Sequence, residues 1–68
     1  MNLYDVMRNL ISITADVVCL DSSYNLLFKH SRGCMVNDDV PETYWTRNVR
    51  AVGLHDDYPN EIVIWVED

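Results

Sequence analysis

The sequence predicts a single α+β domain in which an N-terminal helix packs on a four-stranded antiparallel sheet, built from two hairpins with a short helical turn between them. Three observations support this fold class. Apolar residues near the start of the chain recur at helical spacing, four later segments are rich in β-branched and aromatic residues, and turn-forming residues join these segments in pairs. With 68 residues, the chain is expected to form one domain, residues 1–68, with a thin core.

The N-terminal helix is expected over residues 3–11. Asn2 precedes it as a capping residue, and Asp5 lies near the positive end of its dipole. Its apolar positions follow the i, i+3, i+4, i+7, i+8 spacing of one helix face, namely Leu3, Val6, Met7, Leu10 and Ile11. This face is expected to pack on the sheet.

Two hairpins supply the four expected strands. β-Branched, aromatic and other apolar residues dominate the strands, whereas Asp, Asn, Ser and Pro are concentrated in the turns. The first hairpin comprises strands 13–20 and 26–30 around the turn 21–25, and the second comprises strands 49–55 and 62–66 around the turn 56–60.

The segment between the hairpins is expected to be mostly a connection. Residues 31–39 contain a Gly, a Cys and a run of Asn and Asp, which is typical of a loop. Pro41 suits the first position of a helix and Asp39 is a suitable cap. One helical or 3₁₀ turn is therefore expected at residues 41–46.

Both faces of the predicted sheet are apolar. Residues 17–20, 26–28 and 62–66 are apolar at odd and even positions alike, whereas a sheet with one wet face alternates. A helix of roughly nine residues spans only about 14 Å and covers one face at most. The second face is therefore expected to be a contact surface.

The apolar second face favours a homodimer. The expected dimer seam consists of Ile62, Ile64 and Trp65. In the alternative, the loop that carries Tyr44 and Trp45 folds over this face and closes a monomer.

The chain is acidic, with eleven Asp and Glu against five Lys and Arg and a net charge of −6. This charge repels nucleic acid and anionic lipid, so neither is an expected partner, and it attracts basic protein surfaces. In one interpretation the carboxylates imitate phosphates in a basic nucleic-acid groove, with aromatic residues as anchors. In the other they only keep a small apolar protein dispersed. The expected partner-binding residues are Asp38, Asp39, Glu42, Tyr44, Trp45, Asp56, Asp57 and Glu61, and Tyr58 and Trp65 are the other candidate anchors.

Neither catalysis nor a cofactor is expected. A chain this short has little room for a substrate pocket, and with Gly33 and Gly53 as its only glycines it lacks a phosphate-binding loop. The two Cys and two His residues do not form the close pairs that hold zinc, so no metal is expected. The chain is therefore expected to act by binding.

A cytoplasmic location in a host cell is expected. The sequence contains no run of 18 apolar residues, and its N-terminus lacks the pattern of a signal peptide. In that compartment Cys19 and Cys34 are expected to stay reduced.

Five strand and turn segments, at residues 15–21, 25–28, 40–44, 48–52 and 61–66, together resemble the pattern of short acidic proteins encoded by phages and prophages of Gram-positive bacteria. The resemblance implies a phage accessory protein, a class that includes inhibitors of host defence such as anti-CRISPR proteins. The first hypothesis is therefore an inhibitor that acts as a nucleic-acid mimic and binds a host protein, an RNA-guided nuclease, through its acidic face.

Two other functions are consistent with the same sequence. A structural or scaffolding phage dimer would use only the apolar sheet face. A cyclic-nucleotide signal sponge would hold its ligand at the dimer seam with Lys29, Arg32, Arg47 and Arg50.

The alternation along residues 62–66 allows a test of the two faces. Ile64 and Trp65 lie on opposite sides of the last strand, so one is expected to face the helix and the other a partner. Replacing each by Glu is expected to give one unfolded variant and one folded, monomeric variant, which circular dichroism and light scattering distinguish. Two folded variants of unchanged mass would contradict this assignment.

Overall fold

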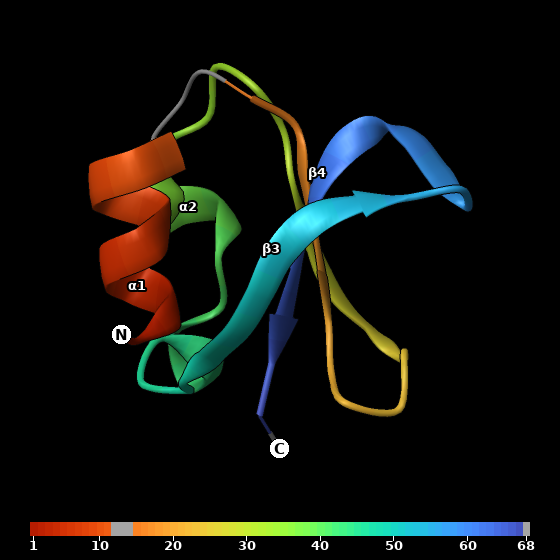
Figure 1. Cartoon of the computed structure of the whole chain (residues 1–68). Coiled ribbons are helices and arrows are strands. Elements are labelled where there is room, and N and C mark those ends of the chain that lie inside the picture. Colours follow the sequence, from red (N-terminus) through yellow and green to blue (C-terminus); the bar gives the residue numbers. More distant parts are fainter. Residues whose placement is uncertain (12–14, 68) are drawn as a thin grey trace.

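The computed structural model describes residues 1–11 and 15–67, and within that part it confirms the α+β class (Figure 1). A short helix, α1 (Leu3–Val6), continues into one π-helical segment, η1 (Met7–Ile11). The strands and the two short helices between them are β1 (Val17–Leu20), β2 (Leu26–His30), α2 (Val36–Asp39), the 3₁₀ turn η2 (Glu42–Tyr44), β3 (Val49–His55) and β4 (Tyr58–Val66).

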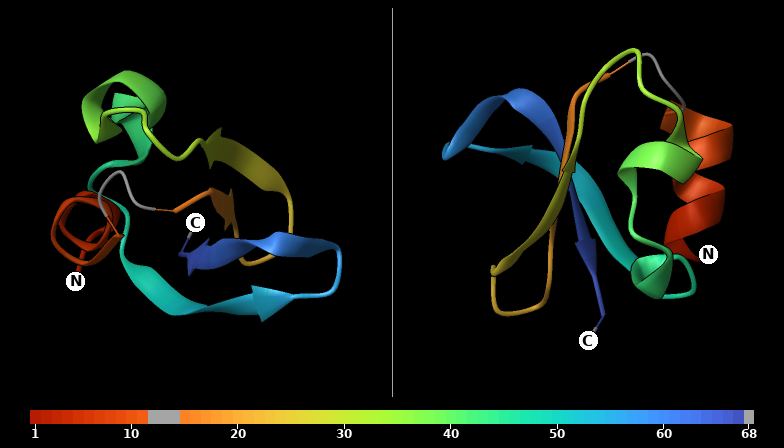
Figure 2. Two further views of the ribbon diagram at one scale, coloured as in Figure 1. Left: turned by 90° about the horizontal axis from the view of Figure 1, so that it is seen from above. Right: turned by 180° about the vertical axis from the view of Figure 1, so that it is seen from behind.

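The sheet is mixed, so the prediction of a purely antiparallel sheet is wrong. Its strand order is β2-β1-β4-β3, in which each hairpin is antiparallel but β1 and β4 pair in parallel at the centre. The cause is the connection between the hairpins, residues 31–48, which carries the chain across the sheet from one edge strand to the other (Figure 2). Turn signals specify each hairpin, but they do not specify how two hairpins join.

Strand bounds agree with the sequence prediction for β2 and β3 and differ for β1 and β4. The first strand begins at Val17, and residues 13 and 14 of the predicted strand lie outside the described residues. The fourth strand begins at Tyr58 because the turn occupies only Asp56 and Asp57. Pro59 near the start of this strand is compatible with it, since proline is tolerated there.

The N-terminal helix begins as predicted and is held by the segment that follows α2. The side chain of Asn2 accepts a hydrogen bond from the Asp5 N–H at 2.9 Å, which is the expected cap. The N–H groups of Leu3 and Tyr4 donate to the carbonyls of Arg47 (2.8 Å) and Trp45 (3.1 Å). These bonds tie the first turn of the helix to the chain that leads into β3.

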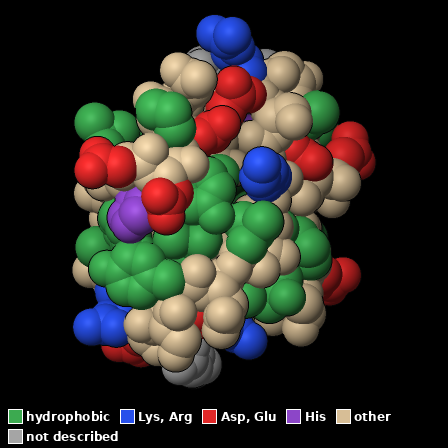
Figure 3. Space-filling model, turned by 90° about the vertical axis from the view of Figure 1, so that its right-hand side faces the viewer, with side chains coloured by type: hydrophobic (Ala, Val, Ile, Leu, Met, Phe, Trp, Pro, Cys, Tyr) green, Lys and Arg blue, Asp and Glu red, His purple; other side chains and the backbone are tan. Residues whose placement is uncertain are grey.

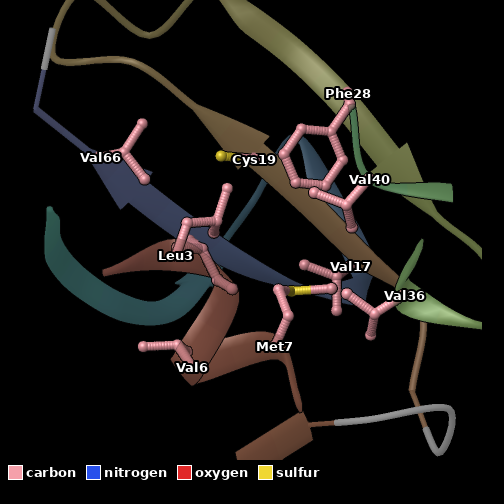
Figure 4. Close-up of a cluster of buried hydrophobic side chains, with 10 residues drawn as sticks. Leu3, Val6, Met7, Val17, Cys19, Phe28, Val36, Val40 and Val66 are labelled. Atoms are coloured by element: carbon pink, nitrogen blue, oxygen red, sulfur yellow. The ribbon is translucent and has the colours of Figure 1, made fainter. Parts of the chain in front are cut away.

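The main core lies between the sheet and this helical layer (Figure 4). The helix contributes Leu3, Val6 and Met7, all at most 2% exposed. The sheet and α2 segment contribute Val17, Cys19, Phe28, Val36, Val40, Ile64 and Val66. Fully burying one such side chain stabilises the fold by about 1.5–3 kcal/mol, so this layer is the main source of stability.

The segment around α2 was predicted as a loop and contains one helical turn. Asp39 anchors its end, since its carboxylate accepts from the Ser31 N–H at 2.6 Å and lies 3.2 Å from Nδ1 of the buried His30. Val36 and Val40 are buried against the core. A single turn containing Asn and two Asp has the composition of a loop, which is why the sequence did not reveal it.

Tyr44 and Trp45 pack on the helix side, so the alternative in which their loop covers the second face is wrong. The rings of Tyr4 and Trp45 have centroids 4.5 Å apart, and those of Phe28 and Tyr44 stack at 5.9 Å. The Trp45 indole N–H donates to the Val40 carbonyl at 2.9 Å. Aromatic partners on the helix side therefore hold this loop there.

The two cysteines differ in environment. Cys19 is fully buried and Cys34 is exposed. Burial raises the pKa of the Cys19 thiol from an ordinary value of 9.0 to about 12, mainly because the thiolate would be desolvated. The contribution of this thiol to stability is complete below pH 9 and is lost as the pH rises toward 12.

Titration with a thiol reagent at pH 8 is expected to modify Cys34 rapidly and Cys19 only as the chain unfolds, because the reactive species is the exposed thiolate. The variant Cys34→Ser is the matched control and is expected to show no rapid phase before denaturant is added. Two rapidly reacting thiols in the folded wild type would contradict the burial of Cys19.

Candidate interaction surface

The side of the sheet away from α1 carries a small buried cluster beneath a layer of rings. Val18, Leu20 and Val63 are at most 1% exposed, and Tyr58 and Trp65 pack against them. The register of β3 against β4 shifts twice, a feature that bends and twists a hairpin, and Figure 1 shows the hairpin tip turned away from α1. This curvature helps the sheet to cover its own second face.

Four rings form what we call the aromatic face, namely Tyr24, His55, Tyr58 and Trp65. The centroid of Tyr24 lies 5.8 Å from that of His55 and 6.1 Å from that of Trp65. His55 lies 6.3 Å from Tyr58 and 6.4 Å from Trp65. Figure 3 views this side of the molecule and shows hydrophobic side chains gathered there, with Asp or Glu side chains beside them.

Trp65 is a half-buried ring of the aromatic face and lies beside Gly53 of β3. A Cβ atom at Gly53 would lie 3.7 Å from Cζ3 of Trp65, so the indole lies directly against the backbone of β3. Its Nε1 is buried and has no hydrogen-bond partner. An unsatisfied buried donor costs about 1–3 kcal/mol, which the packing of the ring must offset.

Tyr24 occupies a strained position in the turn between β1 and β2. Its φ is +65°, and it is the only residue other than glycine with positive φ among the described residues. The left-handed conformation costs about 1–2 kcal/mol for residues with a side chain, and Gly or Asn adopts it more readily. Tyr24 is nevertheless 60% exposed and belongs to neither buried cluster, so its ring is not needed to fill the core.

Asp21 holds this turn in place. Its carboxylate accepts from the N–H groups of Ser23 (2.8 Å) and Asn25 (2.9 Å), and its carbonyl accepts from the Tyr24 N–H at 3.0 Å. The hydrogen bond from the Asn25 N–H is the main cause that lowers the pKa of Asp21. The turn is therefore held most firmly above the ordinary pKa of 3.8 and loosens as the pH falls through the lowered value.

Opposite charges flank the aromatic face. A hollow of about 410 Å³ lies beside Tyr24 and is lined by Ser22, Tyr24, Arg50, Ala51 and Trp65, so one basic residue belongs to its lining. At the other end of β3, Asp57 Oδ2 lies 3.7 Å from Nδ1 of His55, and the Asp57 side chain is 80% exposed. Asp56 is also exposed.

The predicted partner-binding residues divide into two separate groups. Asp38 and Glu42 are exposed on the helical layer, and Asp56 and Asp57 are exposed at the hairpin tip. The remaining four have partly or mainly structural positions: Asp39 bonds to Ser31, Tyr44 and Trp45 pack on the main core, and Glu61 is half-buried with one carboxylate oxygen unpaired. The expected single acidic face is thus not formed by these eight residues together.

The predicted seam residues also fall on different sides of the sheet. Ile64 is fully buried and Ile62 packs against the same main core under the helix, whereas Trp65 lies on the aromatic face. Trp65 and Tyr58 were recognisable as aromatic anchors in the sequence. The positions of Tyr24, His55 and Arg50 depend on the turn and on the curvature of the hairpin. Arg50 was a candidate only as a cation of the nucleotide alternative, and no sequence motif marked Tyr24 or His55 as part of this surface.

Neither a cluster of metal-ligating side chains nor a membrane-spanning helix is found in the part of the chain that is described. Residues 1–11 and 15–67 contain no group of three or more His, Cys, Asp or Glu side chains arranged to hold a metal ion. None of the helices in these residues has the length and apolar character needed to cross a bilayer.

Comparison of the chain with family models, with curated proteins and with solved structures found no match. The resemblance to phage accessory proteins stays a prediction from the sequence.

Replacing Tyr24 by Asn tests whether this residue serves the fold. The substitution is expected to change the free energy of unfolding by less than about 1 kcal/mol, because relief of backbone strain offsets the lost ring contacts with His55 and Trp65. Thermal and denaturant unfolding measure the change. Asp21→Ala is the contrasting variant and is expected to destabilise the turn, whereas a loss of several kcal/mol in Tyr24→Asn would show that the ring is structural.

Proposed function

We propose that the chain is a binding protein whose aromatic face docks on a basic surface of a partner protein. The observation that carries this proposal is the exposed or half-buried set of four rings on one side of the sheet, with Asp56 and Asp57 beside it. Tyr and Trp are the residues most enriched among those that dominate binding energy. The net charge of −6 steers the chain toward a basic partner.

The partner class that best suits this surface is an enzyme with a nucleic-acid groove. Grooves that hold single-stranded nucleic acid combine positive charge for the backbone with platforms on which bases stack. In the proposed complex the carboxylates of Asp56 and Asp57 take the place of phosphates, and the rings of Tyr24 and Trp65 take the place of bases. Binding would block the groove without any chemical step.

The resemblance to phage accessory proteins supports a specific enzyme as the one that contains the groove, namely an RNA-guided nuclease of the host's defence. The cyclic-nucleotide alternative is less well supported, because its four cations do not gather. Arg47 lies over Tyr44 at 5.1 Å, Lys29 lies over Tyr58 at 6.0 Å, and Arg32 and Arg50 line different hollows.

The proposal is tested by DNA cleavage with a panel of purified RNA-guided nucleases in the presence of the protein. The wild type is expected to inhibit at least one of them, less strongly as salt is raised, because salt screens the attraction. Asp56→Asn with Asp57→Asn is expected to raise the inhibitory concentration about tenfold, equivalent to about 1.4 kcal/mol.

The matched control is Asp38→Asn with Glu42→Gln, which removes the same number of charges from the helical layer. It is expected to change inhibition less than about threefold. Equal effects of the two double variants would assign the role of the acidic residues to net charge alone, and absence of inhibition across the panel would refute the proposed enzyme class.

A further inference from the structure

Tyr24 and the hollow beside it have the form of a knob next to a hole. Tyr24 is 60% exposed as a residue, and it also lines the hollow of about 410 Å³. That volume lies near the lower end of the range of about 300–1,000 Å³ for ligand pockets, which is ample for one aromatic side chain. A knob adjacent to a hole is self-complementary under a two-fold axis that passes between them.

We infer that a second copy of this chain occupies the aromatic face, with Tyr24 of each copy seated in the hollow of the other. In this arrangement the ring of Tyr24 packs on Trp65 and Ala51 of the opposite copy. The strained backbone of Tyr24, which Asn or Gly would relieve, is then explained by the contact that its ring makes.

The charges beside the aromatic face also suit a two-fold dimer, because Arg50 and Asp57 lie on opposite sides of Tyr24. Tyr24 shares the hollow with Arg50 and also contacts His55, whose imidazole lies 3.7 Å from Asp57. Across the face the order is therefore Arg50, Tyr24, His55, Asp57. A two-fold axis beside Tyr24 makes the same residues of the second copy run in the opposite direction. Arg50 of each copy is thereby brought toward Asp57 of the other, so that opposite charges meet on both sides of the axis.

One side of the molecule is large enough for a dimer interface of standard size. A standard interface buries about 800 Å² per partner. The chain exposes 4242 Å², so such an interface would use about a fifth of its surface. The net charge of −6 on each copy opposes association, so we expect a reversible dimer in the micromolar range rather than an obligate one.

Self-association has a consequence that rests on the proposed function. A target and a second copy compete for the same rings, so the dimer cannot bind the target and the monomer is the form that does. Dilution then favours target binding by mass action.

The test measures the mass of the intact chain by sedimentation equilibrium from 1 µM to 1 mM, concentrations on the order of those that bracket a micromolar dimer. The wild type is expected to shift from 7.9 kDa toward twice that mass. Tyr24→Asn is expected to weaken the dimer at least tenfold while its melting temperature stays close to that of the wild type.

Charge exchange tests the pairing itself. Arg50→Glu and Asp57→Arg are each expected to weaken the dimer about tenfold, and the double variant is expected to restore it. The matched control Asp38→Arg, on the helical layer, is expected to leave the dimer intact. Circular dichroism of each variant shows that it is folded.

A wild type that stays at 7.9 kDa throughout would overturn the inference and leave the proposed function standing. A dimer that is indifferent to the Tyr24 and charge variants would show that another surface associates, which also overturns it. A dimer with the expected variant pattern, but with no nuclease inhibited, would refute only the proposed function.

Discussion

The parallel pairing of β1 with β4 is the constraint on which the rest of the structure depends. These two strands contain most of the fully buried residues of the sheet, including Val17, Val18, Cys19, Val63 and Ile64. As the two central strands they are covered on both faces, which accounts for apolar residues at odd and even positions. The other strand of each hairpin, β2 in the first and β3 in the second, is left at an edge. A connection that crosses from edge to edge is then required.

That connection determines how the two faces are covered. It crosses on the side of α1, where Tyr44 and Trp45 pack on the main core and the carbonyls of Trp45 and Arg47 hold the first turn of the helix. The opposite face receives no segment of its own among the described residues. It is covered only by a curved hairpin and the rings of Tyr24, His55, Tyr58 and Trp65, which explains why those rings remain partly exposed.

The carboxylates fall into two groups, those that hold the fold together and those that are exposed to solvent. Asp16, Asp21 and Asp39 each accept hydrogen bonds from backbone N–H groups near turns, and these bonds fix the chain at both ends of the first hairpin. Asp38, Glu42, Asp56 and Asp57 remain exposed. The acidic character of this chain thus serves folding in one part and recognition, as proposed, in another.

The sequence by itself determined the local elements of this protein. The spacing of apolar residues predicted the helix from residue 3, apolar, aromatic and β-branched residues bounded by turn residues predicted β2 and β3 with their observed bounds, and the alternation along β4 correctly placed Ile64 and Trp65 on opposite sides. These features depend on residues close together in the chain, where periodicity and turn chemistry act directly.

Only the tertiary structure decided how these elements combine. The parallel β1–β4 pair, the side on which the connection crosses and the union of Tyr24, His55, Tyr58 and Trp65 all join residues far apart in the chain. The free energy of these long-range contacts depends on which surfaces pack together. Several arrangements of two hairpins and a helix are compatible with the same turn residues and the same spacing of apolar residues. Long-range packing selects among them, because the large apolar side chains of both central strands must be covered at once.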